Sequence, residues 1–169
     1  MRRFISASAI IATVLLVSLV GAKPIYAESP QDADALSGLQ EVKVAFDIQT
    51  GNSAALLKQL EVIEETRESL IKQGVKPSFV ITFRGPATKL VQTDPSQIPA
   101  EDRANASTIA GKIRALKGAE GISGMEQCAV AVRLAGTKQE NVLPEIKVVG
   151  NGWISLMAYQ AKGYGYIAP

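Results

Sequence analysis

A nearly continuous apolar run over residues 79–83 constrains the fold of this chain more than any other feature. A strand with one face in water alternates apolar and polar residues, whereas a strand covered on both faces is apolar almost throughout. Pro77 stands just before the run, where a missing backbone N–H is tolerated. The run therefore predicts a buried strand of a parallel sheet.

The segment before this run predicts a strand followed by a long helix. Apolar residues alternate with polar or small ones over residues 42–46, which is the pattern of a strand. Residues 54–73 have the spacing of three and four that indicates a helix, with Ser53 as the expected N-cap and Gly74 at its end. Only Arg67 interrupts the apolar stripe of this helix, which consists of Leu56, Leu60, Ile63 and Leu70.

The rest of the chain continues the alternation of strand and helix. Five strands joined by helical crossovers predict an α/β fold, a three-layer α/β/α sandwich with a five-stranded, mainly parallel sheet. The further expected elements are a helical turn at 87–91, helices at 100–116, 129–134 and 152–162, and strands ending at Cys128 and spanning 146–149 and 164–167.

The first residues resemble a targeting segment. Arg2 and Arg3 precede an apolar run over residues 4–22, and Ala27 is a small residue at a cleavage position. Residues 1–27 therefore predict a signal peptide and a periplasmic or secreted protein. The run is long for a signal peptide, so an uncleaved membrane anchor is the alternative. We expect a flexible lead-in at 28–40 and one domain at 41–169.

The charge of the chain depends on that leader. The whole sequence has 18 Lys and Arg against 16 Asp and Glu, but Arg2, Arg3 and Lys23 lie in the leader and no acidic residue does. Removing them leaves 15 basic and 16 acidic residues, a net charge of −1. No later cluster of basic residues is interleaved with aromatic ones, so nucleic-acid binding is not expected. No membrane contact is expected after cleavage.

Few conventional chemistries are open to this sequence. It has no histidine and one cysteine. Nucleophile systems that use histidine, histidine-ligated metals, cysteine pairs and cysteine-rich metal sites are therefore excluded within one chain. Neither of the usual glycine-rich phosphate motifs occurs. We predict no metal and no cofactor.

The single cysteine, Cys128, is the candidate catalytic residue. It is expected where a strand runs into a helix, and the free N–H groups at a helix N-terminus favour thiolate over thiol. A lone thiol in an exported protein cannot close an internal disulfide. It is then a reactive sulfur, a partner for another chain, or a buried small hydrophobic residue.

Ligands of parallel sheets bind at the carboxyl ends of the strands, where four expected segments meet. Arg84 could hold an anionic sulfur species with its planar guanidinium, or it could pair with a carboxylate such as Asp47. Asn151 could donate to bound sulfur or simply form a turn. The candidate ligand-binding residues beside Cys128 are Asp47, Arg84, Gly85, Asn151 and Gly152.

The chain resembles the DsrE/DsrF-like proteins, in particular an exported branch of them, over about residues 40–169. The resemblance rests on segments 42–47, 77–85, 126–129 and 150–164. It implies a five-stranded α/β/α fold, homo- or hetero-oligomers and, as in the sulfur-relay members, a cysteine that carries persulfide sulfur. Cys128 corresponds to that cysteine by its place after the third strand.

Two functions are expected from these observations. The first is a sulfur carrier or sulfurtransferase-like protein that holds sulfane sulfur on Cys128 and exchanges it with a donor or acceptor protein or a small sulfur compound. The second is a non-catalytic, oligomeric binding module with a packed, unreactive cysteine. A homo-oligomer is expected in both. Four aromatic residues fit a core or a subunit interface better than a flavin site: Trp153, Tyr159, Tyr164 and Tyr166.

Overall fold

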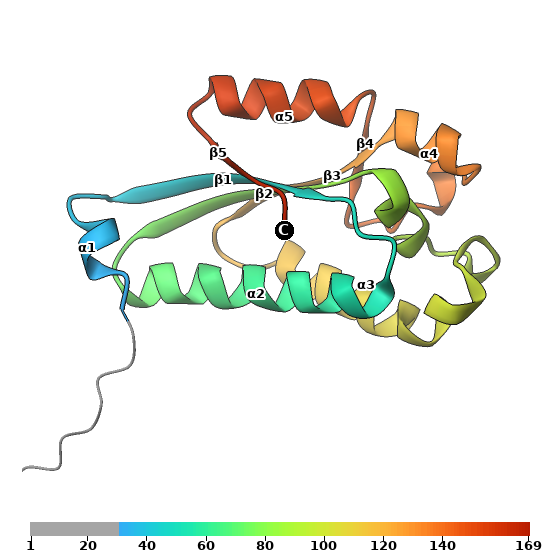
Figure 1. Ribbon diagram of the computed structural model, residues 1–169, viewed down its shortest axis with the longest axis horizontal. Coiled ribbons are helices and arrows are strands. Elements are labelled where there is room, and N and C mark those ends of the chain that lie inside the picture. Colours follow the sequence, from blue (N-terminus) through green and yellow to red (C-terminus); the bar gives the residue numbers. More distant parts are fainter. Residues whose placement is uncertain (1–30) are drawn as a thin grey trace, which may run out of the picture. The chain divides into compact units, whose positions relative to one another are not determined.

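The computed structural model describes residues 31–169, which form an α/β fold around a five-stranded sheet (Figure 1). All strand pairs are parallel, and the strand order is β4-β3-β2-β1-β5. The predicted α/β/α sandwich with its mainly parallel sheet is confirmed. The expected signal peptide or anchor lies outside the described residues. The strands are β1 (Glu41–Ile48), β2 (Lys76–Phe83), β3 (Ile122–Cys128), β4 (Lys147–Val149) and β5 (Gly165–Ile167).

Helices cover both faces of this sheet. Figure 1 shows α2 and α3 along one face and α5 along the other, with α4 near the end of the sheet where the strands finish. A short helical turn, α1, precedes the first strand. The α-helices are α1 (Ala33–Leu36), α2 (Ser53–Lys72), α3 (Ala106–Lys117), α4 (Ala129–Ala135) and α5 (Gly152–Ala161), and the 3-10 helices are η1 (Gly85–Leu90), η2 (Pro95–Gln97), η3 (Ala100–Asn105) and η4 (Gln139–Asn141).

The strand order explains why α5 lies apart from α2 and α3. The chain steps from β1 through β2 and β3 to β4 in one direction, and then returns across the whole sheet to place β5 beside β1. Crossovers between parallel strands are right-handed, so a reversal of direction moves the connecting helix to the opposite face. The α5 layer is therefore a consequence of the position of β5.

The face of the sheet under α2 and α3 is closed and mostly apolar, with Gln127 at the end of β3 as a buried polar residue. Alternate residues of β1, β2 and β3 point into it and meet the apolar stripe of α2 and that of α3. Phe46 and Phe79 pack edge to face there, with ring centroids 5.1 Å apart. The fully buried side chains of this core include Ile48, Leu56, Leu60, Ile81, Phe83, Ile113 and Met125.

The opposite face carries polar side chains in its buried part. In the register of the sheet, Asp47 lies beside Thr82, and Thr82 lies beside Glu126. All three residues are buried. They form a polar row across β1, β2 and β3 beneath the α5 layer, and Cys128 follows Glu126 on the same face of β3.

Some element boundaries differ from the expectations. Asn52, not Ser53, caps α2, because its Oδ1 accepts a hydrogen bond from the backbone N–H of Ala55 at 2.9 Å. The backbone N–H of Ser53 instead donates to the buried Asp102 carboxylate at 2.8 Å. The helix expected at 100–116 begins as the 3-10 helix η3 and becomes α-helical only at α3.

No helix among residues 31–169 combines the length and the apolar character needed to cross a membrane.

Candidate functional site

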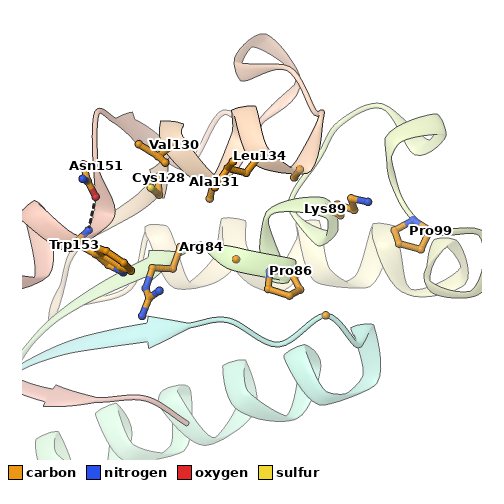
Figure 2. A pocket seen from close by; sticks show the side chains of 13 residues that line it. Arg84, Pro86, Lys89, Pro99, Cys128, Val130, Ala131, Leu134, Asn151 and Trp153 are labelled. Carbon is orange, nitrogen blue, oxygen red and sulfur yellow. Dashed lines mark hydrogen bonds between the residues drawn. The ribbon is translucent and has the colours of Figure 1, made fainter.

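A cavity of about 600 Å³ lies at the carboxyl ends of β1 to β4. Its walls come from the segments that follow these four strands, as expected for a parallel sheet. Figure 2 shows Cys128, Asn151, Trp153 and Arg84 at one end and Lys89 with Pro99 at the other. The remaining lining residues are Gly51, Gly85, Pro86, Val130, Ala131, Leu134 and Ala135.

Cys128 is the last residue of β3 and the N-cap of α4. The strand-to-helix junction predicted for it is therefore present. The residue is free and only 5% exposed, yet it lines the cavity. Its surface is thus accessible from the cavity rather than from the outer surface of the protein.

The start of α5 lies directly against this cysteine. A Cβ atom added to Gly152 would lie 3.0 Å from Cβ of Cys128, 3.6 Å from its Sγ and 3.3 Å from Cγ2 of Thr82. Only a residue without a side chain allows so close an approach. Gly152 therefore acts by letting the N-terminus of α5 pack on Cys128, and it is not itself among the residues that line the cavity.

Arg84 is paired with Asp47 inside the protein. Its Nε donates to Oδ1 of Asp47 at 2.6 Å, and its second terminal nitrogen donates to Oδ2. The Asp47 carboxylate also accepts hydrogen bonds from the Tyr166 hydroxyl at 2.6 Å and the Gln49 amide at 3.0 Å. Of the two roles considered for Arg84, the structure contains the pairing with Asp47.

This pairing directs the Arg84 guanidinium away from Cys128. Figure 2 shows the guanidinium pointing toward β1, while Cys128 lies on its other side. Burial lowers the pKa of Arg84, but the hydrogen bonds and negative charge of Asp47 outweigh it and leave the pKa raised. The same guanidinium lies 5.8 Å from the ring centroid of Trp153. Arg84 therefore holds the wall of the cavity in place.

Asn151 and Gly85 shape the turns that enter the site. The Asn151 Oδ1 accepts a hydrogen bond from the Trp153 backbone N–H at 3.0 Å and so caps α5 (Figure 2). Its amide nitrogen donates no hydrogen bond to another group within residues 31–169. Gly85 has φ of 54°, a left-handed conformation that turns β2 into η1.

The residues at the other end of the cavity were not among those predicted from the sequence. Lys89 lies in η1, and among the described residues no carboxylate lies within ion-pair distance of it. Pro99 precedes η3, and Leu134 is 79% exposed on α4. The sequence contains no periodic signal that distinguishes this exposed leucine from a core residue.

A second group of polar atoms lies beneath α5. The Tyr159 hydroxyl donates to Oε1 of Glu126 at 2.8 Å, whereas Oε2 of Glu126 and Oγ1 of Thr82 are buried without a partner. Burial, followed by the hydrogen bond and charge of Glu126, raises the pKa of Tyr159 to about 12. Within residues 31–169 no cluster of three or more acidic or cysteine side chains could hold a metal ion.

Comparisons with known proteins support the fold but not a function. No protein-family model matches the chain. An uncharacterized protein of Aquifex aeolicus is 28% identical over 126 residues, which cover 75% of this chain but 55% of that protein, so the chain spans about half the length of this relative. The structure of MTH1491, a protein of unknown function from Methanobacterium thermoautotrophicum, covers 76% of this chain and 99% of its own, with a TM-score of 0.59 and 19% identity.

Proposed function

We propose that this protein is a sulfur carrier or sulfurtransferase-like protein that holds sulfane sulfur as a persulfide on Cys128. The observation that carries the proposal is the placement of this free cysteine, which lines a 600 Å³ cavity at the junction of β3 and α4. The resemblance to DsrE/DsrF-like proteins supports the same chemistry. A cavity at the carboxyl ends of parallel strands is also the usual place for a ligand.

The proposed step is the attack of the Cys128 thiolate on the outer sulfur of a persulfide donor, R–S–SH. The new S–S bond forms as the donor's own S–S bond breaks, and the donor leaves as the thiolate R–S⁻. One sulfur atom moves, the charge is conserved and no outside oxidant is needed. Attack by an acceptor thiolate on the outer sulfur of Cys128 persulfide returns the sulfur by the same route.

Hydrogen-bond donors lie around Cys128 that could hold sulfur bound to it. The N-termini of two helices lie at the thiol, because Cys128 caps α4 and Gly152 begins α5 against it. Helix N-termini carry a partial positive charge and unpaired N–H groups. The amide nitrogen of Asn151 is a further donor at the same end of the cavity. In this proposal Arg84 acts indirectly, by positioning Trp153.

Intact-mass spectrometry after incubation with polysulfide tests the proposal. We expect the native protein to gain the mass of one sulfur atom, and the gain to disappear after treatment with a thiol reductant. Cys128→Ser should fold normally and gain nothing. The proposal is wrong if the native thiol stays unmodified by polysulfide and by iodoacetamide until the protein is unfolded.

The burial of Cys128 favours a second candidate, a non-catalytic binding module. A free cysteine is often a small packed hydrophobic residue, and at 5% exposure this one is among the buried side chains of the protein. Arg84, which could have held an anionic sulfur, is already neutralised by Asp47. Alkylation only after unfolding is the result that this second function predicts.

We also propose that the protein forms a homo-oligomer. The outer side of α5 exposes Ile154 and Met157, each about 60% exposed, and Trp153 and Leu134 at the cavity are exposed as well. Exposed apolar residues grouped in this way are typical of protein interfaces. Light scattering should therefore give a mass above that of one chain, and Met157→Lys should reduce it. A wild-type protein that is monomeric at micromolar concentration contradicts this proposal.

The proposed chemistry takes place outside the cytoplasm if residues 1–27 act as a signal peptide. The expected product begins at Glu28. Intact-mass analysis of protein from its native host distinguishes this product from an uncleaved, membrane-bound form that still carries Met1.

A further inference from the structure

The cavity is much larger than an inorganic sulfur anion requires. A water molecule occupies about 30 Å³ in the liquid, and an ion such as thiosulfate has only a few heavy atoms. The cavity, at about 600 Å³, lies within the range of about 300 to 1,000 Å³ that is usual for sites of small organic molecules. A sulfur anion alone would leave most of this space to water.

The walls of the cavity are mostly apolar. Between the Cys128 end and the Lys89 end they consist of Pro86 and aliphatic side chains, with the indole of Trp153 at the Cys128 end and Pro99 at the Lys89 end. Water gains few hydrogen bonds against such walls, so an apolar group that replaces it is favoured by about 25 cal/mol for each Å² removed from water. The middle of the cavity therefore fits an apolar ligand body.

The charges of the cavity differ between its two ends. At the Cys128 end the positive charge of Arg84 is neutralised by the buried carboxylate of Asp47. At the other end Lys89 is exposed and has no carboxylate partner within residues 31–169. Figure 2 shows Lys89 next to Pro99, far along the cavity from Cys128. The unpaired positive charge of Lys89 thus lies at the end of the cavity opposite Cys128.

We propose that this cavity binds an organic anion with an apolar body. The anionic group lies at Lys89, the body lies against Pro86, Pro99 and Leu134, and the other end reaches Cys128. This inference goes beyond sulfur transfer, because it names a class of ligand and requires no reaction of the thiol.

Trp153 provides a direct measurement, because it is the sole tryptophan of the chain and lines the cavity. We would titrate the purified protein with hexanoate, octanoate and decanoate and follow the fluorescence of Trp153. Saturable binding is expected, tighter by about fourfold for each added methylene that is buried. The titration contains no sulfur donor, so a positive result is independent of persulfide chemistry.

Lys89→Gln tests the anionic end. It should weaken octanoate binding about two- to fivefold, the range of an exposed ion pair, and leave the binding of neutral octanol unchanged. Lys58→Gln is the matched control, since Lys58 is an exposed lysine of α2 that does not line the cavity. An equal effect of Lys89→Gln on octanoate and octanol overturns the assignment of Lys89.

Two further variants separate the cavity from the apolar surface of α5. Ala135→Phe places a large side chain in the cavity and should weaken binding at least tenfold, while thermal unfolding confirms that the variant is folded. Met157→Lys changes the outer side of α5 and should leave binding unchanged. No saturable binding, or binding that Met157→Lys abolishes and Ala135→Phe does not, overturns the proposal. Octanoate binding without any sulfur uptake would support this inference and contradict the sulfur carrier.

Discussion

The two faces of the sheet differ in what they bury. The face under α2 and α3 is apolar apart from the fully buried Gln127 at the end of β3, and its apolar side chains belong to one continuous core. The face under α5 buries the polar row of Asp47, Thr82 and Glu126, together with Cys128. On the first face Gln127 donates a hydrogen bond to Thr88, and a polar substitution among the apolar core residues would have no such partner. On the second face Asp47 and Glu126 accept hydrogen bonds, whereas the Thr82 hydroxyl has no partner.

The two faces therefore have different roles: the face under α2 and α3 stabilises the fold, and the face under α5 carries the candidate site. Apolar packing depends on the area removed from water and on filled volume, and it requires no particular chemistry at any one position. Buried polar groups lower stability unless they are paired, so their presence on one face calls for an explanation. The cavity opens at the end of that same polar face, and we interpret the α2/α3 face as its rigid support.

Two neighbouring residues of β2 should give the largest change in stability. Phe83 and Thr82 are both fully buried but point to opposite faces of the sheet. Phe83→Ala should lower the free energy of unfolding by about 3–5 kcal/mol through lost burial and a new void. Thr82→Val keeps the shape and removes a hydroxyl without a partner, so it should change stability by less than about 1 kcal/mol. Urea unfolding measures both, and similar losses would contradict the distinction between the faces.

The ion pair on the α5 face comes second in expected effect. Asp47→Leu leaves the mostly buried charge of Arg84 without its partner and should cost about 3 kcal/mol. Adding Arg84→Met removes the second charge, so the double variant should be more stable than Asp47→Leu alone. Chemical denaturation of the wild type, Asp47→Leu, Arg84→Met and the double variant gives the four free energies of a double-mutant cycle. A double variant no more stable than the single one would show that this pair does not account for the loss.

The sequence predicts much of the layout of the site. The apolar run in β2 and the alternating patterns around it indicate a parallel sheet, and the carboxyl ends of parallel strands lie at one edge. Arg84, Cys128 and Asn151 each follow a different strand, and the structure brings all three to the cavity. Residues far apart in the chain could thus be placed together without a predicted strand order.

The charges of the site could not be predicted in the same way. Arg84 is suited equally to a sulfur anion and to the Asp47 carboxylate, and only the register of β1 on β2 brings the two side chains together. Lys89 lies in a 3-10 helix, where no apolar period distinguishes a cavity-lining residue from one facing solvent. The pairing of β5 with β1 brings the Tyr166 hydroxyl within hydrogen-bond distance of Asp47. This strand order depends on tertiary packing, and no local sequence pattern indicates it.

Glycine substitutions near α5 should change stability by a smaller amount and test how closely α5 packs on the sheet. A methyl group on Gly152 would lie against Cys128 and Thr82, so Gly152→Ala should push α5 off the sheet and cost about 1–3 kcal/mol. Gly150→Ala is the matched control, since nothing lies within 4 Å of a Cβ added there. Thermal unfolding of both variants gives the comparison. Equal shifts would show that α5 does not pack as tightly on Cys128 as the distances indicate.

The smallest expected effect is a pH dependence of the α5 face. The pKa of Tyr159 is raised from 10.0 to about 12, so the folded protein keeps this proton at a pH where the unfolded chain loses it. The resulting stability is fully present below about pH 10 and is lost as the pH rises toward about 12. Because Tyr159 is only partly buried, solvent screening reduces the size of the effect.

Tyr159→Phe isolates this contribution from that of the other tyrosines. The variant leaves Oε1 of Glu126 without its donor, so it should be less stable at neutral pH by about 1 kcal/mol. Its free energy of unfolding should then fall less steeply than that of the wild type between about pH 10 and about pH 12. Urea unfolding across this range provides the measurement. Parallel curves would mean that the hydrogen bond to Glu126 does not hold the proton of Tyr159 in the folded protein.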